Sequence, residues 1–326
     1  ADEWQAVFLS STLFYLLWRV MPASEDEHVW MWRAVDGLVA GGALIAIIGL
    51  AQRIFGVGLI AAEGVLRVRA VYGSPNNLAL YLERILPICL GVAAFGVQHA
   101  RRRWAYGLLS LPIIAALYLT YSRGAWLVGL PAALLVLGLA GGGKWRWAAL
   151  GVVAALLLAL LPLAGAERLA SAFDLSAGTG LARLRLWQGA WNMARDYPWL
   201  GVGPDNFLDA YRTRYVLPSA WQDLNLSHPH NLFLDALTRL GALGLAAFLA
   251  MLAALASRLL WLIRHVPPRA GGELFIGLTG SVAAGLAHGL IDNSFFLVDL
   301  ALVFMMIAGL TARWSAANAE GRALAH

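Results

Sequence analysis

Apolar runs of about 17 to 30 residues recur along this 326-residue chain and limit its possible folds more than any other feature. A run of this length crosses the hydrocarbon core of a bilayer as an α-helix. The runs lack the alternating apolar and polar pattern of membrane β-strands. Charged residues make up 13% of the chain, about half of what a soluble domain carries. These features predict an all-α protein, a polytopic bundle of transmembrane helices, because helices satisfy their own backbone hydrogen bonds in lipid.

Nine runs are long enough to be spans. They cover residues 4–21, 34–53, 76–98, 104–121, 124–140, 145–164, 231–262, 273–292 and 296–314. Six lie in an N-terminal part, residues 1–164, and three in a C-terminal part, residues 231–326. Residues 165–230 form one long polar loop, for which glycines and prolines predict short helices and coil. Because an apolar run starts almost at Ala1, we expect further helices to precede this sequence.

The positions of basic residues predict which side of the membrane the long loop occupies. Basic clusters at residues 101–103, 144–146 and 258–269 fall in alternate loops, which the positive-inside rule assigns to the cytoplasm. The loop 165–230 then lies on the opposite face, together with the tight turn that carries Arg123. An arginine on a short external turn between two apolar runs indicates an anionic ligand.

Two histidines at the end of the long loop are the best lead to function. His228, His230 and Asn231 stand where the loop enters an apolar run. Histidine gives and accepts protons near neutral pH, so we predict His230 as a general base, with His228 as the alternate. Asp235 follows Asn231 by one helical turn and can orient a polar group. A structural alternative stays open, in which both histidines cap the helix and bind water.

A metal ion at this histidine pair is disfavoured by the sequence. Two histidines in an HxH pattern can bind zinc, but a zinc site needs a third and usually a fourth ligand. The one cysteine, Cys89, lies inside an apolar run, and of the other histidines only His288 is expected at a similar depth. The sequence therefore predicts neither a metal nor another cofactor.

A short amphipathic helix is predicted within the long loop, over residues 183–191. Its Trp187 and Trp191 stand one turn apart, as in a helix whose tryptophans lie at the headgroup level of a membrane. We predict Arg185 as a phosphate contact, because a guanidinium group binds phosphate oxygens with two parallel hydrogen bonds.

Ionisable residues inside the predicted spans need partners. Glu83 and Arg84 are adjacent, so their side chains point about 100° apart and are not simply paired with each other. His288 and Asp292 stand four residues apart and can share one helix face. A hydrogen bond that serves the structure is favoured there over a functional role.

These motifs occur in the order typical of one family. The sequence resembles the O-antigen ligase/O-antigen polymerase superfamily of bacterial membrane glycosyltransferases over about residues 70–310. The resemblance rests on residues 75–77 (PNN), 120–126 (TYSRGAW), 185–187 (RLW), 198–203 (PWLGVG), 227–237 (SHPHNLFLDAL) and 241–244 (GALG). One departure is Arg239, where members usually carry an acid. The family has more spans than the nine predicted here.

The resemblance implies transfer of a glycan from a polyprenyl diphosphate, such as undecaprenyl diphosphate, to an acceptor hydroxyl on a lipid A–core sugar. It implies an inverting, metal-independent reaction at the periplasmic face of the bacterial inner membrane, with a lipid bilayer but no nucleic acid as partner. Arg123 and Arg185 then bind the diphosphate, and His230 is the base with His228 as the alternate. The predicted supporting residues are Asn231, Asp235 and Asn76.

Other functions stay open. An O-antigen polymerase and a protein O-oligosaccharyltransferase would use the same chemistry with another acceptor, and nothing in the sequence reads the acceptor, the sugar or the oligomeric state. A transporter or a structural subunit of a membrane complex is the non-enzyme alternative. A transporter is expected to show broken helices and an internal repeat, and neither is visible in the sequence.

Overall fold

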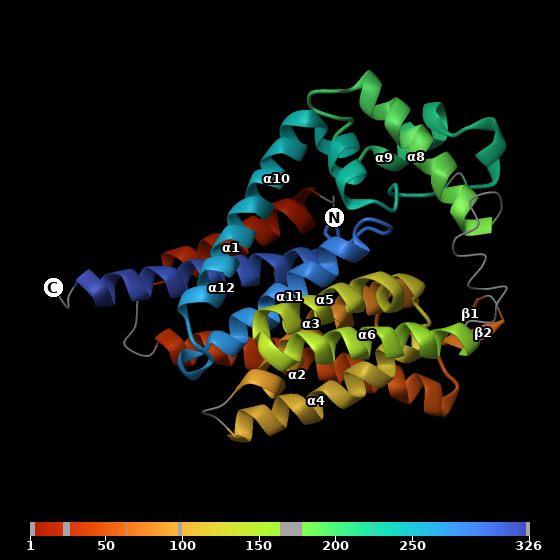
Figure 1. Ribbon diagram of the computed structural model, residues 1–326. Helices are drawn as coiled ribbons and strands as arrows, with labels where there is room; N and C mark the ends of the chain where they lie inside the picture. Colours follow the sequence, from red (N-terminus) through yellow and green to blue (C-terminus); the bar gives the residue numbers. More distant parts are fainter. Residues whose placement is uncertain are drawn as a thin grey trace.

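The computed structural model describes residues 4–21, 27–62, 64–96, 100–163, 178–223 and 225–323. Within these ranges the chain is almost wholly helical, which confirms the all-α class. The one sheet described is a hairpin of β1 (Ile60–Ala62) and β2 (Val65–Arg67), which lies in the predicted loop between the second and third spans. Figure 1 shows a bundle of long helices and a smaller group of helices, the loop part, carried at one end of α10 (Leu232–His265).

The bundle contains α1 (Ser10–Val20), α2 (Glu27–Phe55), α3 (Pro75–Phe95), α4 (Ala100–Leu119), α5 (Leu130–Gly141), α6 (Gly143–Leu163), α11 (Gly272–His288) and α12 (Val298–Ala323), with the π-helical turns η1 (Trp4–Leu9) and η2 (Ala125–Gly129). The loop part contains α8 (Gly178–Asp196), α9 (Phe207–Ala210), η3 (Tyr211–Tyr215) and η4 (Pro218–Asp223). A short turn, η5 (Pro268–Ala270), joins α10 to α11.

Each of the nine predicted spans overlaps a described helix. Three of the described helical segments are long and apolar enough to cross a membrane: Val29–Phe55, Pro75–Phe95 and Leu232–His265. Crossing by the other six stays a prediction. The three long apolar helices indicate an integral membrane protein.

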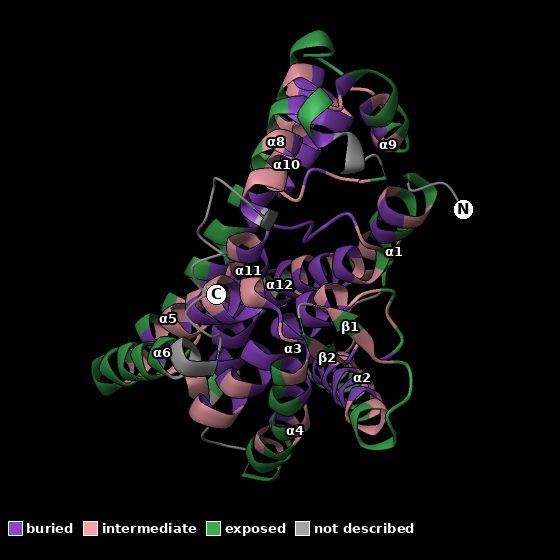
Figure 2. Cartoon of the chain, turned by 90° about the vertical axis from the view of Figure 1, so that its right-hand side faces the viewer, coloured by how far each residue is buried: buried purple, intermediate pink, exposed green. Residues whose placement is uncertain are grey.

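Helix α3 lies at the centre of the bundle, whereas α10 lies at its edge. In α3, 83% of the most apolar window is buried inside the protein, against 17% in α10. A Cβ atom on Gly91 would lie 2.7 Å from the Cα of Gly277, so glycine lets α3 and α11 approach closely. Figure 2 shows buried residues concentrated around α3, α11 and α12, with exposed residues along α6. The exposed side chains of α10 therefore suit contact with lipid.

Helix α10 is broken near its start, and the 198–203 segment repairs the break. Gly241 has φ +68°, which interrupts the helical hydrogen bonds. The replacement hydrogen bonds run from Ala242 N to Pro198 O (2.7 Å), Leu243 N to Trp199 O (3.3 Å), Val202 N to Thr238 O (2.9 Å) and Gly203 N to Arg239 O (3.0 Å). Side chains at Gly201 or Gly241 would collide with this backbone. The two glycine motifs of the sequence thus fix the loop part to α10.

The loop part has a hydrophobic core of its own. This core consists of Leu186, Ala190, Met193, Phe207, Tyr211 and Tyr215. Helix α8, with 19 residues, is longer than the short helices expected from the sequence. Residues 165–177 and 224 of the predicted loop lie outside the described residues. The division into parts 1–164, 165–230 and 231–326 stays a prediction.

Candidate active site

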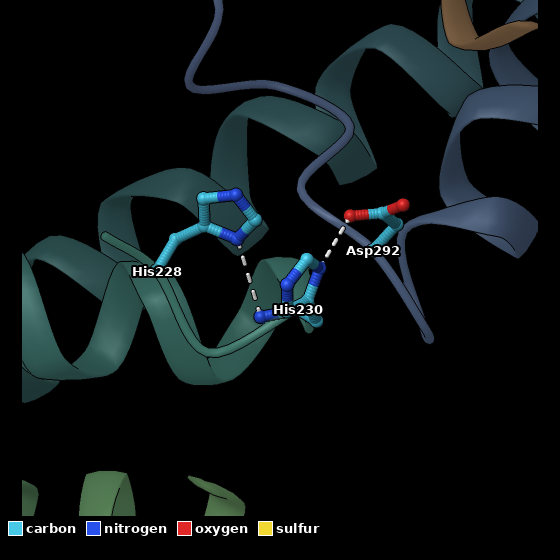
Figure 3. Close-up of side chains that lie close together, drawn as sticks. All are labelled: His228, His230 and Asp292. Atoms are coloured by element: carbon cyan, nitrogen blue, oxygen red, sulfur yellow. Dashed lines mark hydrogen bonds and ion pairs between the residues drawn. The ribbon is translucent and has the colours of Figure 1, made fainter. Parts of the chain in front are cut away.

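His230 and Asp292 form the centre of the candidate site (Figure 3). The Nδ1 atom of His230, which stands just before α10, lies 2.7 Å from Oδ1 of Asp292 in the loop 289–297 between α11 and α12. A hydrogen bond of 2.6 Å from Leu232 N to Gly289 O holds the two loops together. The His230 side chain is 28% exposed and that of Asp292 only 7%. The imidazole is therefore accessible, while the carboxylate behind it is shielded.

The charge of Asp292 suits a partner of a base. Burial raises the pKa of the Asp292 carboxyl, but the hydrogen bond from His230 and the charges of nearby histidines hold that pKa below its usual range. An ionised carboxylate accepts the Nδ1–H of His230 and leaves Nε2 free of a proton, as a base requires. The sequence linked Asp292 only to His288, and that link is a backbone hydrogen bond, Asp292 N to His288 O at 3.0 Å.

His228 lies beside His230 but is a weaker candidate for the base. The two ring centroids are 4.3 Å apart, and His230 N–H donates to His228 Nδ1 at 3.4 Å (Figure 3). Burial lowers the pKa of His228 to about 3, and the charge of His230 lowers it as well. An imidazole with such a low pKa is a poor proton acceptor at neutral pH. The electrostatics thus favour His230.

These residues also bear on metal binding. His228, His230 and Asp292 each offer one ligand atom, and these atoms lie within 4.8 Å of one another. Asp292 supplies the third ligand that the sequence did not reveal, and three protein ligands are the number found in open catalytic zinc sites. The trio could therefore hold a divalent cation, and the absence of a metal stays a prediction.

Asn231 and Asp235 hold the backbone around the histidines. Oδ1 of Asn231 caps α10 by accepting the N–H groups of Phe233 (3.1 Å) and Leu234 (2.9 Å), and its Nδ2 donates to Leu290 O at 2.9 Å. Asp235 is fully buried, and its Oδ1 accepts from Nε of Arg239 at 2.6 Å.

Arg239, the departure from the family pattern, fixes the loop that carries the histidines. Its Nη2 donates to Ser227 O at 2.6 Å, and its Nη1 donates to Pro204 O. The Asp235 carboxylate accepts from this guanidinium group, and a supporting role for Asp235 in the site stays a prediction. The pair ties α10 to two segments of the loop part.

Arg123 stands at the end of a braced turn. It is the first helical residue before η2, and it follows Tyr121, whose φ is +49°. Arg67 of β2 donates from Nε to Thr120 O at 2.6 Å and from Nη2 to Asn76 Oδ1 at 2.7 Å. Asn76 therefore supports the Arg123 turn through Arg67, a contact that residue spacing could not reveal.

Two arginines near the start of helix α8, Arg183 and Arg185, lie on different faces of the helix. Nη1 of Arg185 donates to Ser219 O of η4 at 2.6 Å. Trp187 Nε1 donates at 2.8 Å to Pro229 O, the carbonyl between the two histidines. Arg183 stands four residues before Trp187, on the same helix face, whereas Arg185 is about 200° around the helix from Arg183.

Electrostatics agree with that assignment of faces. Burial lowers the pKa of Arg183, while the charge of Asp292 raises it and that of Arg123 lowers it. Arg183 therefore interacts with two residues of the candidate site. The sequence pattern did not single out Arg183, although its helical spacing from Trp187 was a usable signal, and a role for either arginine stays a prediction.

Residues 108–249 match the family model for O-antigen ligase. The predicted resemblance to this superfamily is thereby confirmed. The O-antigen ligase match includes Arg123, α8 and both histidines, whereas Asn76 and Asp292 lie outside it. It indicates a membrane glycosyltransferase of the ligase or polymerase type. No curated protein compared with the chain matches it.

Proposed function

We propose that the protein transfers a glycan from a polyprenyl-diphosphate carrier to an acceptor hydroxyl, with His230 as the general base. The observation that carries this proposal is the hydrogen bond of 2.7 Å between Nδ1 of His230 and Oδ1 of Asp292. A hydroxyl is a poor nucleophile until its proton is removed, and an imidazole oriented by a carboxylate removes it near neutral pH.

The reaction proceeds in one step. The acceptor oxygen forms a bond to the anomeric carbon of the glycan, while the bond from that carbon to the diphosphate oxygen breaks and its electron pair leaves with the diphosphate. The acceptor proton goes to Nε2 of His230. Attack opposite the diphosphate inverts the anomeric carbon, and isolation of a covalent glycosyl-enzyme would contradict this course.

Arg123 and Arg183 bind the diphosphate in this proposal. Fixed guanidinium groups stabilise the charge that develops on the leaving group, so no acid is needed. The sequence pointed to Arg185 as the second cation. We favour Arg183 because it shares a helix face with Trp187, whose Nε1 donates to Pro229 O between the two histidines, whereas Arg185 bonds to the carbonyl of Ser219.

The lipid-linked donor and the orientation of the loops support a site at the periplasmic face of the inner membrane. The basic clusters of the sequence assign the opposite loops to the cytoplasm. Among the acceptors, we propose a lipid A–core sugar, which makes the protein a ligase.

The base is tested with the full chain in proteoliposomes, a polyprenyl-diphosphate-linked glycan and a core glycolipid acceptor. His230→Ala should lower kcat by about 10² to 10⁴-fold, the usual contribution of a general base. His265→Ala, at the far end of α10, is the matched control and should keep wild-type turnover. Near-normal turnover by His230→Ala would refute the assignment.

The acceptor is tested in a strain that lacks the gene. A ligase predicts that the long polysaccharide accumulates on the carrier and is missing from the lipid A–core. Single unextended repeat units would instead identify a polymerase. An unchanged glycolipid profile would contradict both.

A further inference from the structure

A second histidine–carboxylate pair lies inside the bundle. Nδ1 of His288, at the end of α11, lies 2.9 Å from Oε1 and 3.0 Å from Oε2 of Glu83 on α3. The side chain of His288 is 2% exposed and that of Glu83 is fully buried. A buried histidine–carboxylate pair is costly to desolvate and is weak evidence for stability by itself, so its presence asks for another reason.

The π-helical turn η2 and the residue before it cover this pair with two glycines, Gly129 and Gly124. A Cβ atom on Gly124 would collide with Nε2 of His288, and one on Gly129 would collide with Oε2 of Glu83. In an α-helix, residues five apart point about 140° away from each other. Hydrogen bonds from i to i+5 widen the turn and bring such residues closer to one face, so the π-helix suits this cover. Both glycines are thus needed for the turn to approach the pair.

The same pair connects the two halves of the candidate site. On one side, the His288 ring packs on Gly124, which directly follows Arg123. On the other side, the carbonyl of His288 accepts the N–H of Asp292 at 3.0 Å, and Asp292 binds His230. His288 therefore contacts the turn that carries Arg123 through its ring, and the turn that carries Asp292 through its backbone carbonyl.

Arg84 braces the same loop from the neighbouring position on α3. Its Nη2 donates to the carbonyl of Ser294, and its guanidinium group packs on Gly285 of α11. Glu83 and Arg84 thus have separate partners, as their different directions on the helix predict. Glu83 itself contacts η2, because its carboxylate packs on Gly129. This contact involves the Glu83–His288 pair rather than Arg84.

We propose that Glu83 and His288 are positioning residues that set the spacing between Arg123 and the His230–Asp292 pair. The inference rests on the proposed function of that site. Its physical basis is that the Glu83 carboxylate fixes the His288 ring, and the ring fixes the backbone at Gly124. A shift of the Arg123 turn moves the diphosphate relative to the base, and a misplacement of about 1 Å costs about 10²-fold in rate.

The test is a kinetic comparison of variants in proteoliposomes, with the polyprenyl-diphosphate-linked donor and the acceptor varied separately. Gly124→Ala places a methyl group against the His288 ring, and Glu83→Leu releases that ring. We expect each variant to raise the donor KM and to lower kcat, so that kcat/KM for the donor falls by about 10 to 100-fold. The acceptor KM should stay unchanged. Glu83→Gln keeps the shape and a hydrogen-bond acceptor, so it should recover most of the loss.

A merely structural defect gives a different result. Partial unfolding lowers the active fraction, so kcat falls while both KM values stay at the wild-type level. Glu273→Gln is the matched control, because it removes another buried carboxylate about 22 Å away along α11. We expect wild-type kinetics from this variant. The double variant Gly124→Ala/His288→Ser removes the collision and should be less impaired in donor KM than the two single changes predict together.

Two failures can be told apart. If the wild-type chain neither binds a polyprenyl diphosphate nor transfers a glycan, the proposed function is wrong. If the wild type is active and Gly124→Ala and Glu83→Leu both keep its donor KM, only the positioning role is overturned. Strictly additive effects of Gly124→Ala and His288→Ser would also overturn it.

Discussion

The protein contains two histidine–carboxylate pairs that share the same chemistry and differ in burial. The His230–Asp292 distance is 2.7 Å and the His288–Glu83 distance is 2.9 Å. The His230 side chain is 28% exposed, against 2% for His288. A substrate hydroxyl can reach the first imidazole but not the second. Access therefore suits His230–Asp292, the outer pair, to proton transfer. Contact with Gly124 suits His288–Glu83, the inner pair, to positioning.

Asp292→Asn should have the largest effect on kcat, because it keeps the shape of the side chain that contacts His230 but removes its negative charge. The amide cannot hold the Nδ1–H tautomer of His230 or stabilise the imidazolium, so kcat should fall by about 10² to 10⁴-fold. Steady-state kinetics with saturating donor measure this. Asp209→Asn, an exposed carboxylate in the loop part, is the control. If Asp292→Asn turns over normally, the outer pair has no catalytic role.

Arg183→Lys and Arg185→Lys test which face of α8 meets the substrate. Lysine keeps the charge but loses the two parallel hydrogen bonds, so Arg183→Lys should raise the donor KM by about tenfold. Arg185→Lys should change the donor KM much less, because Arg185 bonds to a backbone carbonyl. Donor titrations of both variants decide between them. The reverse order would restore Arg185 as the diphosphate contact.

His228→Gln should have a small effect on activity and a visible effect on acid stability. With a pKa of about 3, His228 stays neutral in the folded protein above that pH, whereas in the unfolded chain it binds a proton below about 6.5. The free energy of unfolding therefore falls as the pH drops from about 6.5 toward 3, and it should fall less in the His228→Gln variant. Thermal unfolding between pH 4 and 7 measures this difference. If the thermal stability of the wild type and of the variant depends on pH in the same way, burial does not lower the pKa of His228.

Removal of metal should have the smallest effect. Although His228, His230 and Asp292 could bind a cation, we expect a chelator such as EDTA to leave kcat unchanged, because the arginines already supply positive charge. Turnover after dialysis against the chelator checks this. Loss of activity that zinc restores would make the outer pair part of a metal site.

Local sequence patterns were sufficient to predict much of the fold and some of the candidate site residues. The apolar runs predicted the helices, and the ordered motifs predicted the family. His230 and Arg123 could be selected from the sequence because a basic side chain beside a membrane span needs a partner or a function. Gly201 and Gly241 belong to two motifs of the sequence, but the packing of these motifs on each other could not be foreseen.

The sequence by itself determined the helical class and the residue types available for chemistry, since both depend on neighbours within a few turns. Only the tertiary structure decided the pairings. Asp292 reaches His230 across 62 residues and Glu83 reaches His288 across 205. Such contacts depend on how α3, α10 and α11 pack, and the spacing of residues along one helix carries no record of that packing.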